Sequence, residues 1–166
     1  MALPNPLMMK SILCLCLAVV VSPAAFAADL PDAKTIAGNW TPIKAELGGQ
    51  PLPDAVMKTI SLTLADGKYE AMAEGRPDYG TYSLDAAAQP KGMTVTGTKG
   101  PNQGKTFPCI YELNGDTLRI CYDLSGTKRP SEFKSVAGTQ LYLVTYKRKK
   151  QLVSSNAPTP VKKPGE

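Results

Sequence analysis

Short segments in which apolar and polar residues alternate recur along the chain from Gly38 to Arg148. In one of them Ile60, Leu62 and Leu64 share a face, with polar residues between them. Such alternation is typical of antiparallel strands with one face in water. It predicts eight strands: Trp40 to Leu47, Ile60 to Ala65, Lys68 to Met72, Tyr79 to Leu84, Met93 to Thr98, Thr106 to Leu113, Thr117 to Asp123 and Gln140 to Lys147. Because a meander of this kind avoids exposed edges by closing on itself, we expect an all-β fold, a small up-and-down antiparallel barrel.

Turn residues place two hairpins and two short helices within this pattern. Asp66-Gly67 and Asn114-Gly115 are dipeptides that favour two-residue hairpin turns. A helix from Asp32 to Ala37 would end at Gly38, and a second from Pro53 to Thr59 would have its proline in the first turn.

The second hairpin bears on the two cysteines of the barrel. With Asn114-Gly115 as the turn, Leu113 opposes Asp116 and Cys109 opposes Ile120, so Cys109 points inward and Cys121 outward. A disulfide would need a one-residue slip that scatters the apolar face. Burying four or five large side chains, at about 1.5 to 3 kcal/mol each, outweighs the roughly 2 to 4 kcal/mol of one disulfide. We therefore favour free thiols over the disulfide that export would otherwise suggest.

The first 27 residues have the features of a secretory signal peptide. Lys10 precedes an apolar run from Ser11 to Val21, and Ala25 to Ala27 forms a small-x-small cleavage site. Apolar residues continue past Cys14 and Cys16, which disfavours a lipid-modified cysteine. We expect cleavage after Ala27 and export to the periplasm or the extracellular space.

Residues 28–150 then form one domain, followed by a tail at 151–166 that is rich in proline and lysine. The tail cannot bury apolar area, so we expect it to be disordered, either as a solvated end or as a weak anchor to anionic envelope polymers. The chain has 19 basic and 14 acidic residues. Only 14 basic and 13 acidic residues remain without Lys10 and the charged C-terminal residues Lys149, Lys150, Lys162, Lys163 and Glu166. A nearly neutral domain indicates no nucleic-acid partner, and no other apolar stretch is long enough to span a membrane.

Both ends of the barrel region resemble known proteins. Gly38-Asn39-Trp40 at the first strand and Lys147-Arg148 at the last are similar to the lipocalin-type barrel, in which a late arginine covers a tryptophan at the closed end. The chain more closely resembles an uncharacterised lipocalin-like domain family of exported planctomycete-type bacterial proteins. The matching segments are Gly48 to Pro53, Gly80 to Tyr82, Gly100 to Thr106, Ile110 to Leu118 and Arg129 to Phe133. The resemblance implies a fold but no activity.

Residues that carry catalysis are scarce in this sequence. The chain has no histidine, which excludes Ser-His and Cys-His nucleophiles and the usual zinc sites. Gly100 to Thr106 has one residue too few between its glycines for a phosphate loop and joins two strands. The acidic residues Asp78, Asp85, Asp116 and Asp123 lack calcium-loop spacing and are expected to cap turns. We therefore predict no enzyme, no cofactor and no metal site.

Two pairs of residues are predicted to have structural roles. Arg148 would cover the ring of Trp40 at the closed end, which would stabilise the barrel by about 0.5 to 2 kcal/mol. Arg129 and Glu132 would form a local ion pair that orders the long loop before the last strand, and Phe133 would hold that loop to the barrel.

Two functional classes remain for the expected monomer. In the first, the barrel holds a small apolar ligand, with the helix at Pro53 to Thr59 as a lid and with Val56, Met57 and Phe133 as contacts at the mouth. In the second, a filled barrel binds an envelope protein or polymer through its loops. An eight-stranded barrel allows either class. The inward aromatic residues, Tyr69, Tyr82, Phe107, Tyr111 and Tyr122, favour a small ligand or none.

Overall fold

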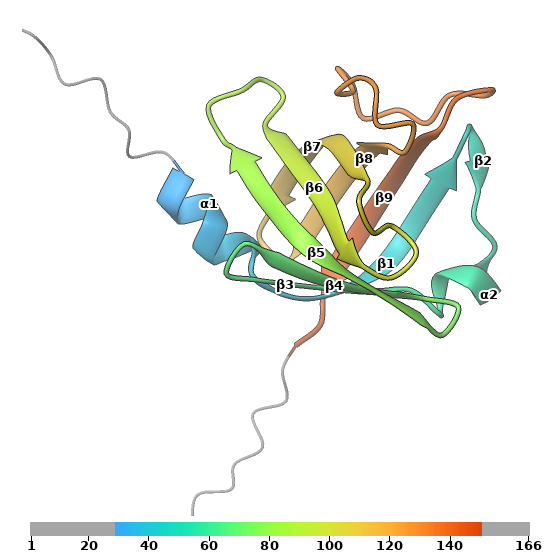
Figure 1. Cartoon of the computed structure of the whole chain (residues 1–166), viewed down its shortest axis with the longest axis horizontal. Helices are drawn as coiled ribbons and strands as arrows, with labels where there is room; N and C mark the ends of the chain where they lie inside the picture. Colours follow the sequence, from blue (N-terminus) through green and yellow to red (C-terminus); the bar gives the residue numbers. More distant parts are fainter. Residues whose placement is uncertain (1–28, 151–166) are drawn as a thin grey trace, which may run out of the picture.

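The computed structural model describes residues 29–150, so the predicted signal peptide and tail lie outside the described residues. The chain forms one antiparallel sheet in the order β2-β1-β3-β4-β5-β6-β7-β8-β9, which closes because β1 also pairs with β9 (Figure 1). The predicted all-β barrel of eight strands is confirmed. The strands are β1 (Gly38–Leu47), β2 (Gln50–Pro51), β3 (Ser61–Ala65), β4 (Lys68–Ala73), β5 (Arg76–Asp85), β6 (Gly92–Lys99), β7 (Thr106–Asn114), β8 (Thr117–Asp123) and β9 (Leu141–Arg148).

The first strand closes the barrel by pairing on both of its edges. Gly38 to Trp40 pair with β3, and Trp40 to Leu47 pair with β9. Ile43 is the extra residue of a bulge in β1, since Pro42 pairs with Tyr146 and Lys44 with Thr145. The bulge turns Ile43 outward, where it is 57% exposed, and so lets both Pro42 and Ala45 face the interior. The two-residue β2, which extends the sheet beside β1, was not predicted.

One hairpin has the predicted turn, and the other does not. Ala65 pairs with Lys68, so Asp66-Gly67 is the two-residue turn between β3 and β4. Between β7 and β8, Asn114 pairs with Thr117, and the turn is Gly115-Asp116 rather than Asn114-Gly115. Only the first of these two turn residues has a positive φ, +55°, which is the pattern of a type II′ turn.

The predicted register of that hairpin was therefore wrong by two residues, and its side-chain faces were right. Tyr111 lies opposite Ile120, and Cys109 lies opposite Tyr122. Because side chains alternate with a period of two, a shift of two residues changes the partners but leaves every inward residue inward.

Both cysteines are free thiols, as predicted. Cys109 belongs to the core inside the barrel. Cys121 is also fully buried, but its Sγ lies 3.5 Å from the Lys134 carbonyl, beneath the long loop between β8 and β9. Burial raises the pKa of both thiols, so neither is an activated nucleophile.

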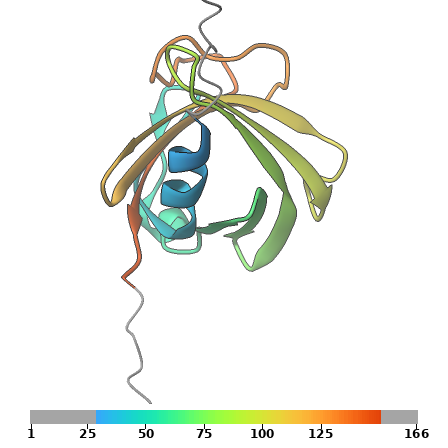
Figure 2. The ribbon, with the colours of Figure 1, turned by 90° about the vertical axis from the view of Figure 1, so that its left-hand side faces the viewer.

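Two short helices lie at opposite ends of the barrel. Helix α1 (Asp29–Ile36) stands against one end (Figure 2), and α2 (Asp54–Met57) lies at the other, beside β2 (Figure 1). Both helices begin and end within about three residues of their predicted bounds. Neither is long and apolar enough to cross a membrane.

The end next to α1 is the closed end of the barrel. The Trp40 indole donates a hydrogen bond to the Ile36 carbonyl (3.0 Å), and both residues are almost fully buried. The Asp32 carboxylate of α1 accepts hydrogen bonds from Lys91 (2.6 Å) and from the Tyr111 hydroxyl (2.7 Å). These contacts hold the helix across the barrel, so any opening must lie at the other end.

Candidate functional site

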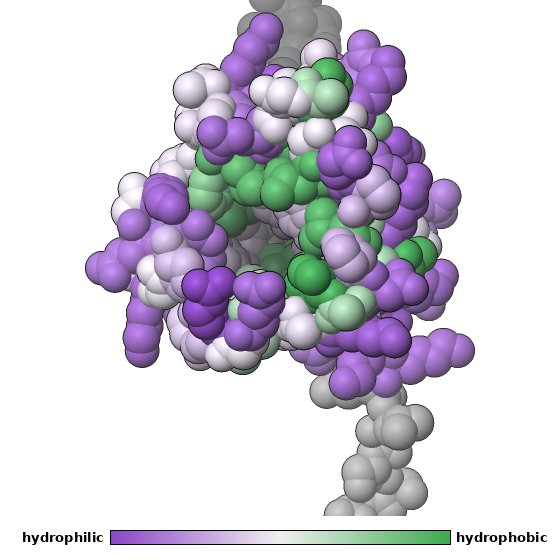
Figure 3. Space-filling model, turned by 90° about the vertical axis from the view of Figure 1, so that its right-hand side faces the viewer, coloured by the Kyte–Doolittle hydropathy of each residue, from purple (hydrophilic) through white to green (hydrophobic). Residues whose placement is uncertain are grey.

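The opposite end of the barrel contains an apolar cavity of about 360 Å³. Figure 3 looks at the molecule from the side where β2 and α2 lie, and shows a hollow bordered by hydrophobic residues. The apolar lining includes Leu47, Leu52, Ile60, Leu62, Leu64, Ala71, Met72, Ala73, Met93, Val95, Pro101, Phe107, Ile120 and Leu124. The bulky aromatic side chains therefore do not fill the barrel.

The lining comes from alternate positions on the strands. Leu62 and Leu64 lie on β3, Met93 and Val95 on β6, and each pair is separated by one outward threonine. Of the five aromatic residues predicted to point inward, Tyr69, Phe107 and Tyr122 line the cavity. Tyr82 and Tyr111 are buried but do not line it.

One buried carboxylate forms a polar patch on the cavity wall. Asp78 accepts hydrogen bonds from the Tyr69 hydroxyl (2.8 Å) and from the backbone and side-chain amides of Asn102 (both 3.0 Å). Burial and the adjacent Asp78 raise the pKa of Tyr69, so the phenol stays protonated and donates. Asp78 thereby ties the loop between β6 and β7 to the rim of the barrel.

A second polar group on the wall consists of three tyrosines. Tyr122, Tyr142 and Tyr146 all line the cavity. The Tyr122 and Tyr146 hydroxyls are hydrogen-bonded, as are those of Tyr142 and Tyr146. Burial raises the pKa of all three, to about 12 for Tyr142, so the group is neutral. Sequence reasoning missed Tyr142 and Tyr146, although the alternation of the last strand places them on one face.

The three residues predicted to contact a ligand at the mouth, Val56, Met57 and Phe133, do not line the cavity. Met57 packs on the edge of the core, and the neighbouring mouth contact is Leu52, which precedes α2. Phe133 lies on the outer face of the barrel, where the Arg119 guanidinium is 4.6 Å from its ring centroid. The long loop folds back over the outside of β8, so its aromatic residue cannot reach the interior.

The predicted ion pair between Arg129 and Glu132 is also wrong. Glu132 pairs with Lys134 on the surface (2.5 Å). Arg129 donates to the carbonyls of Met93 (2.8 Å) and Cys109 (2.5 Å). It reaches them across Gly92, where a Cβ would lie 2.7 Å from the guanidinium. The arginine therefore fixes the loop to strands β6 and β7 rather than to its own neighbour.

The structure places Arg148 over Trp40 at the closed end. The guanidinium carbon is 4.1 Å from the ring centroid. Arg148 also donates to the carbonyls of Thr35 (2.6 Å) and Ala37 (2.5 Å), where α1 ends, and to the Asp116 carboxylate (3.2 Å). The predicted pair therefore joins the last strand to the first helix and the first strand.

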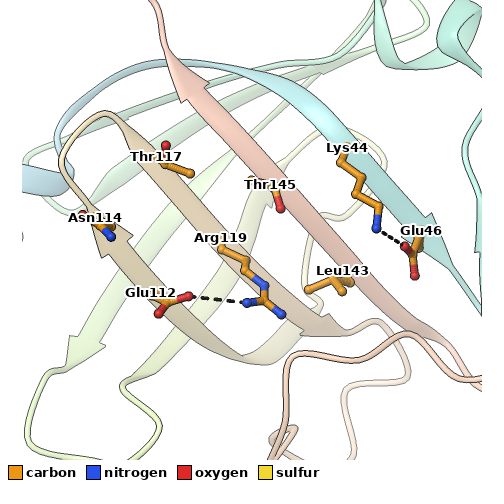
Figure 4. A pocket seen from close by; sticks show the side chains of 8 residues that line it. All are labelled: Lys44, Glu46, Glu112, Asn114, Thr117, Arg119, Leu143 and Thr145. Carbon is orange, nitrogen blue, oxygen red and sulfur yellow. Dashed lines mark ion pairs between the residues drawn. The ribbon is translucent and has the colours of Figure 1, made fainter.

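A polar depression on the outer face of β1, β7, β8 and β9 is the other notable surface feature (Figure 4). It is lined by Lys44, Glu46, Glu112, Asn114, Thr117, Arg119, Leu143 and Thr145. Lys44 pairs with Glu46 (2.9 Å) and Arg119 with Glu112 (3.5 Å). Because these charges neutralise one another in an exposed setting, this surface is a weaker candidate for a ligand site than the cavity.

Neither a metal-binding cluster nor a match to a known protein assigns a role to the cavity. Within residues 29–150, no group of three or more acidic or cysteine side chains could hold a metal ion. Of the four acidic residues predicted to cap turns, Asp123 accepts from the amides of Ser125, Thr127 and Lys128, and Asp85 accepts from the amide of Ala88. Asp78 instead binds Tyr69 and Asn102, and Asp116 pairs with Arg148. No protein-family model, curated protein or solved structure matches the chain. The resemblance to lipocalin-like proteins stays a prediction.

Proposed function

We propose that this protein is an exported, non-catalytic binding module that holds one small apolar molecule in the open end of its barrel. The observation that carries the proposal is the apolar cavity of about 360 Å³. Ligand sites are typically concave and mostly apolar, and they enclose about 300 to 1,000 Å³. This cavity lies at the lower end of that range, which supports a ligand smaller than a typical drug molecule.

The arrangement of the two ends of the barrel also supports a binding module. One end is sealed by α1, Trp40 and Arg148, while the other presents Leu47, which is 43% exposed, at the rim of the cavity. A barrel closed at one end and apolar at the other agrees with the lipocalin-like resemblance, and we propose membership of that family on these grounds.

A fluorescent apolar probe tests the proposal. N-phenylnaphthylamine should bind the purified domain with saturation at one probe per chain, and its emission should rise as it leaves water. Ala71→Leu adds apolar volume to the cavity wall and should weaken probe binding by about tenfold or more. Ala65→Leu is the matched control, since Ala65 is exposed on β3 and lies outside the cavity.

Two results would contradict the binding module. The first is the absence of saturable probe binding by the unchanged domain. The second is equal probe affinity in the Ala71→Leu and Ala65→Leu variants, with both folded by thermal unfolding. Either result would favour a module that contacts an envelope partner through its loops.

A further inference from the structure

The three tyrosines on the cavity wall form a compact cluster. Tyr122 and Tyr142 are direct partners across β8 and β9, and their rings stack with centroids 5.7 Å apart at an angle of 28°. Tyr146 is four residues beyond Tyr142 on the same inward face of β9. All three rings line the cavity in its otherwise apolar wall.

The hydroxyl groups of this cluster have one more proton than they use among themselves. Tyr146 is the shared hydrogen-bond partner of Tyr122 and Tyr142, so two hydrogen bonds link the three hydroxyls. Two hydrogen bonds use two of the three O–H groups, whichever way they point, since each hydroxyl carries one proton. One O–H of the cluster is therefore free for another group, and Tyr142, which lines the cavity, can donate to a ligand while its oxygen accepts from Tyr146.

Tyr142 is also the member of the cluster that is best placed to meet a ligand. It is the second residue of β9 and so lies near the open end of the barrel, and it is half-buried, whereas Tyr146 is buried further along the strand. A donor in an apolar cavity binds an acceptor more strongly than it would in water, because the alternative is an unsatisfied polar group.

We propose that the ligand is a neutral apolar molecule with a carbonyl-type oxygen, and that Tyr142 donates a hydrogen bond to this oxygen. The inference rests on the proposed function, because it assigns the polar contact of the same cavity. Tyr142 is then the residue that sets the orientation of the ligand and distinguishes a ketone, aldehyde or ester from a plain hydrocarbon.

The charges around the cavity favour a neutral ligand over a carboxylate. The wall contains the carboxyl group of Asp78, which a second carboxylate would approach at a cost. The cation on the lining is Arg76, whose side chain is 69% exposed at the rim and pairs with Glu74 (3.1 Å). An anion inside the cavity would lose its hydration without gaining a buried partner.

Three probes of equal chain length test the proposal by competition with N-phenylnaphthylamine: methyl heptyl ketone, nonane and nonanoate. The ketone should displace the probe at the lowest concentration. Tyr142→Phe should weaken ketone binding by about 3- to 10-fold and leave nonane binding unchanged, because it removes only the O–H. Tyr79→Phe is the matched control, since Tyr79 lies outside the cavity beneath Lys99, and should change neither affinity.

The outcomes separate this inference from the proposed function. If the ketone and nonane bind equally well and Tyr142→Phe changes neither, the assignment of Tyr142 is wrong while the apolar binding module stands. Stronger binding of nonanoate than of the ketone would overturn the neutral ligand class and point to Arg76. If none of the three displaces the probe, and the probe itself does not bind, the proposed function fails instead.

Discussion

Trp40 is the residue whose removal should damage the barrel most. Its ring is 1% exposed, it donates to Ile36, and it carries Arg148 over its face. Trp40→Ala should lower the free energy of unfolding by about 3 to 5 kcal/mol, measured by urea denaturation. Arg148→Ala should cost less, about 1 to 2 kcal/mol, because the core itself stays packed. An unchanged stability in Trp40→Ala would contradict the closed end described above.

Asp123 should make stability depend on pH in acid. Burial by itself would raise the pKa of this carboxyl group, but hydrogen bonds from Ser125, Lys128 and Thr127 outweigh it and lower the pKa from 3.8 to about 2. The carboxylate therefore stabilises the fold above about pH 4, and this contribution is lost as the pH falls towards 2. We expect a loss on the order of 1 to 2 kcal/mol over this range.

Asp123→Asn provides the control for this pH dependence. The variant keeps the size of the side chain but cannot titrate, so its free energy of unfolding should fall less steeply between about pH 4 and pH 2. Identical slopes for the variant and the unchanged protein in urea titrations would show that other carboxyl groups cause the acid sensitivity.

Among the elements, the hairpin of β7 and β8 offers a direct test of register. Gly115 is the first turn residue, with φ of +55°, whereas Asn114 pairs with Thr117 as a strand residue. Gly115→Ala should lower the free energy of unfolding by about 1 to 2 kcal/mol, because L residues rarely adopt this conformation. Asn114→Ala should cost less than about 0.5 kcal/mol. A larger loss of stability in Asn114→Ala than in Gly115→Ala would support the Asn114-Gly115 turn that was predicted from sequence.

For the whole molecule, stability should reside in the barrel. The sheet closes on itself within residues 38–148, and the buried core cluster belongs to this part of the chain and to α1. The sequence of residues 151–166 predicts no buried apolar area. Deleting them should leave the melting temperature within about 2 °C of the full-length value by differential scanning calorimetry. A drop of many degrees would mean that the tail packs on the domain.

Sequence reasoning was most successful where the governing physics is local. Alternation along each strand depends only on the backbone's period of two, so the inward faces of β3, β6, β7 and β8 followed from the order of residues. The Asp66-Gly67 turn was right for the same reason, because both residues adopt the positive φ angles that the turn needs. Part of the cavity wall, including Tyr69, Phe107 and Tyr122, was therefore predictable.

The features that sequence reasoning missed depend on contacts between distant segments. Arg129 has no local signal for its partners, since the carbonyls of Met93 and Cys109 meet only when β6 pairs with β7. Phe133 was predicted at the mouth because its loop precedes the last strand. The loop instead folds over the outside of β8, where Phe133 contacts Arg119.

The sequence by itself determined that this chain is an all-β barrel, which residues face inward and that the cysteines do not pair. The tertiary structure decided the hairpin register, the anchoring of the long loop and the existence of the cavity. The direction in which a side chain points is set within one strand, by the backbone's period of two. The volume of the cavity depends on how all the strands and their side chains pack in the closed barrel. No single segment specifies whether the inward side chains of Tyr142 and Tyr146 fill that space or line it.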